Sequence, residues 1–329
     1  MSDTTEVTAE QTSENQEQLQ NLEGQALRER LQKYIEDTGV TINNVARGAN
    51  ISSAALSQWI REIYPSNAKK IEVNVAKFLL REITKKASPK EIIPFLKLSP
   101  AQRFYDVAKI CHHEGEIGVI IGEAGIGKTM SAKQYARENP DVILIEADLG
   151  YTAKHLFNEL HKKIGLSGEE SIHVMLNDLI EKLKNTGRFI IIDEAENLPY
   201  KALDLIRRVY DKANIGLLLV GMPRLLYNLR GRKGEYAQLY SRVAIAERIF
   251  GFTRHDVIVI LKEMLPDYED IKLRGIASYF FKKCGGSDIN TANGRALEKM
   301  LLRSKQVARL NKISIDNEII EQVSKMLIK

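Results

Sequence analysis

The run Gly122-Glu123-Ala124-Gly125-Ile126-Gly127-Lys128-Thr129 constrains the fold of this chain more than any other feature. Residues 117–121 before it are apolar, as in a buried strand, and residues 130–138 after it have helical character. A G-x-x-x-x-G-K-[ST] loop between strand and helix binds phosphate, because its backbone N–H groups and the helix N-terminus face the anion. We therefore expect a nucleotide site from Gly122 to Met130, in which Lys128 reaches the outer phosphates and Thr129 offers its hydroxyl group to Mg²⁺.

A second motif lies at the end of another short apolar segment. Residues 189–192 are too few for a helix and are followed directly by Asp193 and Glu194. We expect Asp193 to hold Mg²⁺, directly or through water. Glu194 is expected to orient and polarise the attacking water, since hydrolysis of a phosphoanhydride depends mostly on positioning and charge stabilisation. Alone, the pair would also suit a solvated acidic turn, but the phosphate loop upstream favours the catalytic interpretation.

The bulk composition excludes some classes of protein. The chain has 329 residues, of which 44% are hydrophobic, enough for two or three domains with apolar cores. No stretch reaches the 18 or so apolar residues of a membrane span, and the acidic N-terminus is unlike a signal peptide. The two cysteines lie far apart, which favours a reducing, cytoplasmic setting. Residues 1–27 hold six acids and no Lys or Arg. The formal net charge is therefore +5 for the whole chain but +11 (5 + 6) for the part after residue 27, which suits a polyanionic partner.

The pattern along the chain predicts five parts. Apolar segments alternate with helical ones after residue 101, which implies a mostly parallel sheet covered by helices on both faces, with the ligand beyond the strand C-termini. The five expected strands are residues 117–121, 142–145, 189–192, 216–220 and 243–249. The expected parts are a disordered acidic tail (1–22), a helix-turn-helix domain (23–86), a linker (87–100), an α/β nucleotide-binding core (101–252) and a helical lid (253–329).

The helix-turn-helix prediction rests on residues 40–61. We expect one helix over residues 42–49 and a second that starts at Ser52 or Ser53 and continues through Arg61. In such motifs the N-terminal residues of the second helix contact base edges in the major groove. A three-helix domain that contacts only protein is the alternative. The outward candidates for DNA contact are Ser53, Ser57, Gln58 and Arg61.

The layout resembles the AAA+ ATPases and, more narrowly, the Mu B type of transposition protein, which activates target DNA in an ATP-dependent way. The phosphate loop and the Asp-Glu strand carry the first resemblance. Domain order, size and the local runs at residues 191–195, 215–221 and 239–242 carry the second. The resemblance implies ATP and Mg²⁺ as cofactors, and duplex DNA, a transposase and further copies of the chain as partners.

The resemblance also implies further site residues. Arg242 matches the arginine that one subunit places at the γ-phosphate of its neighbour, so Lys128, Glu194 and Arg242 form the expected catalytic set. Arg295 matches the nucleotide-sensing arginine of the lid. The polar sensor expected at the end of the fourth strand is missing, because Gly221 is followed by Met222.

A basic segment offers a second candidate for DNA contact. Arg230, Arg232 and Lys233 lie near two glycines, which suits a mobile loop on a DNA backbone, although a merely solvated loop has the same composition. The sequence thus predicts an ATPase that assembles on duplex DNA, mostly without sequence specificity, delivers it to a transposase, and is released by hydrolysis. The alternatives are a replication initiator or helicase loader, and a helix-turn-helix transcription regulator.

Overall fold

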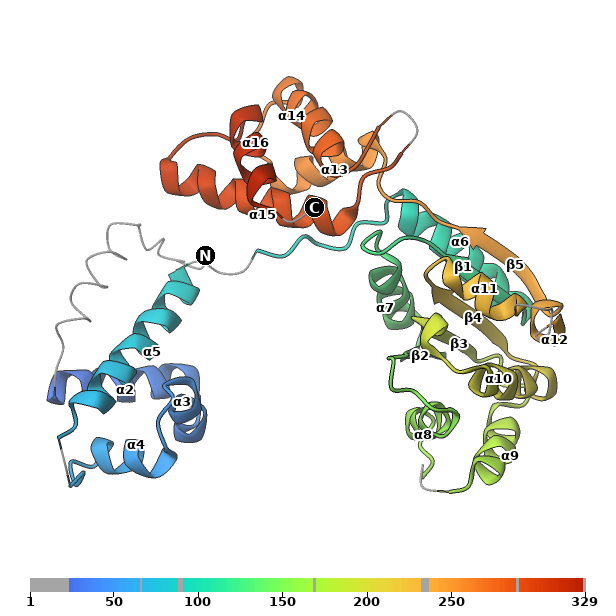
Figure 1. Ribbon diagram of the computed structural model, residues 1–329, viewed down its shortest axis with the longest axis horizontal. Coiled ribbons are helices and arrows are strands. Elements are labelled where there is room, and N and C mark those ends of the chain that lie inside the picture. Colours follow the sequence, from blue (N-terminus) through green and yellow to red (C-terminus); the bar gives the residue numbers. More distant parts are fainter. Residues whose placement is uncertain are drawn as a thin grey trace, which may run out of the picture. The chain divides into compact units, whose positions relative to one another are not determined.

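The computed structural model describes residues 24–65, 67–87, 91–167, 170–231, 237–287 and 290–327, which form two compact units, one up to Ile92 and one from Ile93 onward (Figure 1). The expected tail, residues 1–22, lies outside the described residues. Within them, no helix combines the length and apolar character needed to cross a bilayer.

The first unit is a small helical domain around one apolar core. Thr41 caps α3 and Ser52 caps α4, each accepting a hydrogen bond from the backbone N–H three residues later. Leu56 and Trp59 of α4 are fully buried, while Ile51 and Ile60 are only partly so. The two short helices of the expected helix-turn-helix are therefore present, with Trp59 as an inward residue that the pattern did not single out. The helices are α2 (Gln25–Thr38), α3 (Ile42–Gly48), α4 (Ser53–Ile60) and α5 (Lys69–Ala87).

The second unit contains a five-stranded parallel sheet in the order β2-β3-β4-β1-β5. The three central strands β3, β4 and β1 are buried on both faces, as expected where helices cover both sides of a parallel sheet. All five strands match the sequence-based expectation to within a residue. The strands are β1 (Ile117–Ile121), β2 (Val142–Glu146), β3 (Phe189–Asp193), β4 (Gly216–Gly221) and β5 (Val243–Arg248).

Two groups of helices cover the sheet (Figure 1). One face packs against α6 (Ser99–Glu114) and α7 (Lys128–Glu138) through a core that includes Phe104, Tyr135 and Ile191. The other face packs mainly against α8 (Ala153–Lys163), α9 (Ile172–Leu183) and α10 (Tyr200–Ala213). A turn of 3-10 helix, η1 (Ala195–Asn197), follows β3, and α11 (Arg224–Arg230) and α12 (Ala237–Tyr240) follow β4. The expected α/β fold is confirmed.

The C-terminal helices have an apolar core of their own. Ile93, Leu96 and Leu98, at the end of the expected linker, pack against this core, so the segment before α6 is anchored. The Asp256 side chain also links the start of α6 to the C-terminal helices, because it accepts hydrogen bonds from Ser99 as well as from Thr253. The helices are α13 (Arg254–Met264), α14 (Asp270–Lys283), α15 (Gly294–Asn311) and α16 (Asn317–Met326).

Candidate nucleotide-binding site

The phosphate loop lies between the C-terminal end of β1 and the start of α7. Gly125 and Gly127 have φ angles of 79° and 98°, which L-residues rarely adopt, so these two positions need glycine. Helix α7 begins at Lys128, two residues earlier than the composition indicated, so Lys128 and Thr129 lie in its first turn. The free N–H groups of that turn point along the helix axis toward the loop, which is the geometry expected of an anion site.

The Lys128 side chain is folded over the loop. Its ammonium group donates hydrogen bonds to the carbonyl oxygens of Gly122 at 2.7 Å and Glu123 at 2.8 Å. Burial lowers the pKa of Lys128, while the nearby charges of Asp193 and Glu196 act in the opposite direction. Both loop carbonyls are partners that phosphate oxygens can replace, so the ammonium group is poised at the expected phosphate position.

The Asp193 carboxylate faces the start of α7 from the end of β3. It is 1% exposed, and Oδ1 accepts a hydrogen bond from the Glu194 backbone N–H at 3.0 Å. Burial raises the pKa of Asp193, and hydrogen bonding by Thr129 and by that N–H group offsets part of the rise. Among the described residues, Oδ2 has no hydrogen-bond partner. A buried carboxylate oxygen without a donor, beside a threonine hydroxyl, fits a hard divalent cation such as Mg²⁺.

Glu194 follows in a strained backbone conformation. Its φ angle of 53° lies in the left-handed region, which is uncommon for a residue with a side chain. The turn of η1 comes immediately after it, and the Asn197 side chain donates a hydrogen bond to Glu194 Oε2 at 3.1 Å. The chain therefore reverses sharply at Glu194 and leaves its side chain exposed beside Asp193.

The C-terminal helices contact the phosphate loop directly. Asn293, which caps α15, donates from Nδ2 to the Ala124 carbonyl oxygen at 2.6 Å, and the Arg295 backbone N–H donates to the Gly125 oxygen at 3.0 Å. A Cβ atom on Gly125 would lie 2.7 Å from Asn293 Oδ1, which is a second reason for glycine there. The Arg295 side chain is exposed next to this contact, and its role as a nucleotide-sensing arginine stays a prediction.

Arg242 lies at the N-terminal ends of the parallel strands, whereas the phosphate loop lies at their C-terminal ends. It directly precedes β5, whose first residue pairs with the first residue of β1, whereas the loop follows the last residue of β1. Its side chain is 51% exposed and contacts Asp211 at 3.1 Å. The structure therefore does not bring Arg242 to the phosphate loop of its own chain.

The predicted DNA-contacting residues lie in two places. On α4 and its C-terminus, Ser53, Gln58 and Arg61 are exposed and Ser57 is half-buried. At the end of α11, Arg230 is exposed, and it donates a hydrogen bond to the Tyr240 hydroxyl at 2.7 Å. Arg232 and Lys233 lie outside the described residues.

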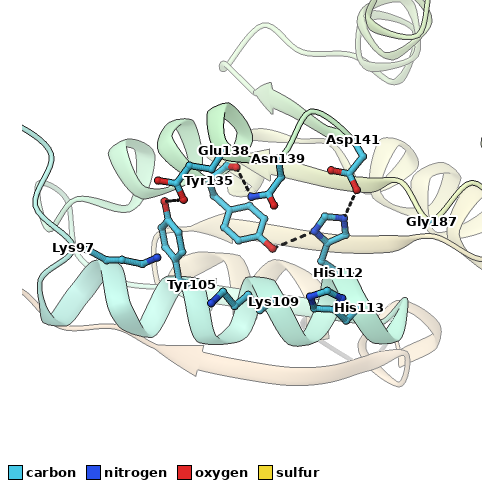
Figure 2. A pocket seen from close by; sticks show the side chains of 10 residues that line it. All are labelled: Lys97, Tyr105, Lys109, His112, His113, Tyr135, Glu138, Asn139, Asp141 and Gly187. Carbon is cyan, nitrogen blue, oxygen red and sulfur yellow. Dashed lines mark hydrogen bonds and ion pairs between the residues drawn. The ribbon is translucent and has the colours of Figure 1, made fainter.

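A separate cavity of about 630 Å³ lies beside α6 and α7. Figure 2 shows that its polar side chains contact one another: His112 lies between the Tyr135 hydroxyl at 3.1 Å and Asp141 at 2.9 Å, and Tyr105 donates to Glu138. The cavity does not include the phosphate loop, and none of the predicted nucleotide-site residues lines it.

The sequence reasoning missed four residues next to the expected site. Asn293 was recognisable as a helix cap before Gly294, and Glu196 as a third acid within one turn of Asp193, but neither signal indicates where the side chain lies. The others are Asn197 and Arg224, which contact each other at 2.9 Å.

Comparisons with known proteins agree with this geometry. Residues 111–229 match the model of a family described as AAA domain. The "Mu-like prophage FluMu DNA transposition protein B" of Haemophilus influenzae is 27% identical over 220 residues, covering 65% of this chain and 77% of that protein. The "ATP-dependent target DNA activator B" of Escherichia phage Mu is 25% identical over 238 residues, covering 71% and 76%.

Solved structures support the fold. The Cdc6p protein of Pyrobaculum aerophilum superposes with a TM-score of 0.55 at 19% identity, covering 73% of this chain and 70% of that one. The ORC2 protein of Aeropyrum pernix gives the same TM-score at 16% identity, covering 74% and 72%. Together with the phosphate loop and the Asp-Glu strand, the family match identifies residues 111–229 as an AAA-domain ATPase core, in a chain that is homologous to the B transposition proteins of phage Mu and of the FluMu prophage.

Proposed function

We propose that this protein assembles head-to-tail on duplex DNA when ATP is bound, delivers that DNA to a transposase, and is released by ATP hydrolysis. The observation that carries the proposal is the division of the catalytic set. Lys128, Asp193 and Glu194 lie at the C-terminal ends of the strands, while Arg242 lies at the N-terminal end of β5. One protomer alone then lacks Arg242 at its γ-phosphate, and a neighbour supplies it.

Residues of two neighbouring protomers act together in hydrolysis. The loop amides and Lys128 bind the phosphates, and Thr129 with Asp193 would hold Mg²⁺, which would supply positive charge to offset that of the phosphates. Glu194 orients the attacking water in line with the scissile bond. Arg242 of the next protomer stabilises the charge that develops on the transferred phosphoryl group. Hydrolysis removes the γ-phosphate that joins the two protomers, and the contact between them weakens.

An interface in which one edge meets a different edge of the next copy is heterologous, and such interfaces generate rings or helical filaments. A filament suits a long polyanion, and the chain beyond the acidic first 27 residues carries a net charge of +11 (5 + 6). The exposed residues of α4 and the segment after Arg230 are the proposed DNA contacts. Because they offer few arginines for base edges, we expect binding to be mostly sequence-nonspecific.

Delivery to a transposase is proposed from the relatives. One is named as a DNA transposition protein and another as an ATP-dependent activator of target DNA, and each aligns over about three quarters of its own length. The proposed role therefore concerns a switch between DNA-bound and free states, with no bond formed or broken in DNA by this chain.

The test measures binding to a random duplex by fluorescence anisotropy, with ATP, with ADP and without nucleotide. Lys128→Ala should lose the nucleotide-dependent part of DNA binding, and Glu194→Gln should bind ATP and remain on DNA for longer than the wild type. Unchanged binding by Lys128→Ala would refute the switch. A footprint at one defined sequence would favour a transcription regulator, and co-purification with a helicase would favour a helicase loader.

A further inference from the structure

The end of β4 carries no polar sensor side chain, and the space beside Gly221 is occupied by another side chain. A Cβ atom on Gly221 would lie 2.1 Å from Glu196 Oε2 and 3.2 Å from a Leu225 methyl group. A side chain at Gly221 would have to displace the Glu196 carboxylate, and Met222 and Pro223 that follow offer no hydrogen-bonding side chain. The place where a polar residue would contact the reacting phosphate is filled from the neighbouring turn η1.

Glu196 is the residue that fills this place. Its side chain is 3% exposed, and Oε2 has no hydrogen-bond partner among the described residues. Its other oxygen lies 3.8 Å from the Arg224 guanidinium group, and its backbone oxygen accepts a hydrogen bond from Asn228 at 3.1 Å. A buried carboxylate with so few donors is stabilised by nearby positive charge, and Arg224 supplies part of it, together with Lys128, whose pKa the charge of Glu196 raises.

Arg224 also contacts the residue that holds Glu194. Its Nη2 donates to Asn197 Oδ1 at 2.9 Å, and Asn197 Nδ2 donates both to Glu194 Oε2 at 3.1 Å and to the Ala147 carbonyl oxygen at 3.2 Å. The guanidinium group can only donate and the Ala147 carbonyl oxygen can only accept, so Arg224 and Ala147 together fix which end of the Asn197 amide faces Glu194. A flipped amide would place its oxygen against the Glu194 carboxylate. Each link in the chain Arg224–Asn197–Glu194 thus depends on the one before it.

We propose that Asn197 and Arg224 are positioning residues for ATP hydrolysis. Asn197 anchors one oxygen of the Glu194 carboxylate and leaves the other for the attacking water, and Arg224 sets the orientation of the Asn197 amide. Asn197 and Arg224 thereby position the Glu194 carboxylate in a site that lacks a polar side chain at the end of β4. The inference rests on the proposed role of Glu194 as the residue that orients water.

The experiment measures steady-state ATP hydrolysis and, separately, affinity for a fluorescent ATP analogue. Asn197→Ala should lower kcat by roughly 10- to 100-fold, since a small misplacement of a catalytic group has an effect of this order. The KM for ATP and the analogue affinity should stay within about threefold, because neither residue contacts the phosphate loop. Arg224→Ala should give a smaller loss of kcat. Retained affinity also shows that each variant is folded.

A double variant separates a linked pair from two independent residues. If Arg224 acts only through Asn197, the double variant should hydrolyse ATP at the rate of Asn197→Ala alone, because the two effects are not additive. The matched control is Asn228→Ala, which removes another contact between α11 and η1 but no contact to Glu194. It should keep kcat within about twofold of the wild type.

Three results would overturn the inference. They are an Asn197→Ala enzyme with an unchanged or raised kcat, an equal loss in Asn228→Ala, and a double variant whose losses multiply. Glu194→Gln is run beside these variants to separate the two proposals. If Glu194→Gln hydrolyses ATP normally, the proposed role of Glu194 fails. If it is inactive while Asn197→Ala is normal, only the positioning inference fails.

Discussion

Replacing Arg242 tests whether the ATPase site is completed by a neighbour. Strand β5 lies between Arg242 and the end of the sheet that carries the phosphate loop. The five steps between its six residues span about 17 Å at about 3.3 Å per residue. An arginine side chain does not cover that distance, so Arg242 cannot act on the nucleotide of its own chain. Arg242→Ala should therefore affect hydrolysis only in assemblies.

The cost to folding should be small. The ion pair with Asp211 is half exposed on the arginine side, and exposed pairs contribute about 0.2–1 kcal/mol. Asp211 also keeps its contact with Arg207 at 2.6 Å, so no carboxylate is left unpaired. Hydrolysis, in contrast, should fall on the order of 10³-fold or more, the usual effect of losing a catalytic arginine supplied by a neighbour.

Mixed assemblies give the decisive assay. Lys128→Ala protomers bind no nucleotide but present Arg242, and Arg242→Ala protomers bind ATP without presenting the arginine. In a 1:1 mixture on DNA, half of the protomers bind ATP and at most half of those face an intact arginine; because Lys128→Ala protomers hold no ATP to join the next copy, up to about one quarter of the wild-type rate should return. Arg208→Ala, which removes a similarly exposed arginine paired with Asp204, is the control. No recovery at any ratio, with co-assembly verified, would refute the reasoning.

Three further predictions concern single residues. Asp193→Asn should stabilise the nucleotide-free protein at pH 7 by about 1–3 kcal/mol, because it removes a buried carboxylate with an unpartnered oxygen, and should abolish the stabilisation by Mg²⁺ and ATP in thermal unfolding. Burial raises the pKa of Asp193, so the folded state binds the carboxyl proton more tightly than the unfolded state does. The stability of the folded wild type therefore falls as the pH rises from the unfolded-state pKa of Asp193 through its folded-state pKa. The gain from Asp193→Asn should accordingly shrink toward pH 4. An equal gain at pH 4 and pH 8 would contradict this origin. Asn293→Asp keeps the cap of α15 but loses the donor to Ala124, so ATP affinity should fall while the melting temperature changes little, and unchanged affinity would argue against a role for this contact. Arg61→Ala should weaken binding to all duplex sequences alike and reduce its salt dependence, and a loss confined to one sequence would indicate base reading instead.

The sequence predicted the sheet well because the first four strands each contain a short apolar run with clear ends. Residues 189–192, for example, lie inside the sheet and contain four consecutive apolar residues, a run too short for a helix and typical of a strand buried on both faces. The phosphate loop was equally clear, since its glycines have backbone angles that few other residues adopt. Motif and local conformation agree at these positions, and that agreement made the prediction reliable.

The rest depended on contacts between residues far apart in the chain. Asn293 lies 169 residues from Ala124, and no local pattern indicates that a helix cap contacts the phosphate loop. Arg224 and Asn197 look like ordinary surface residues in the sequence, and only the packing of α11 on η1 joins them to Glu194. The missing polar residue after β4 was visible, but the buried Glu196 side chain that lies against Gly221 was not.

The central claim is that bound ATP joins protomers along a double helix. Electron microscopy of the purified protein with random duplex DNA and a non-hydrolysable ATP analogue tests it most directly, with Lys128→Ala as the control. The account predicts regular head-to-tail assemblies on DNA for the wild type and none for Lys128→Ala. Isolated protomers that ignore DNA while the analogue is bound would contradict it.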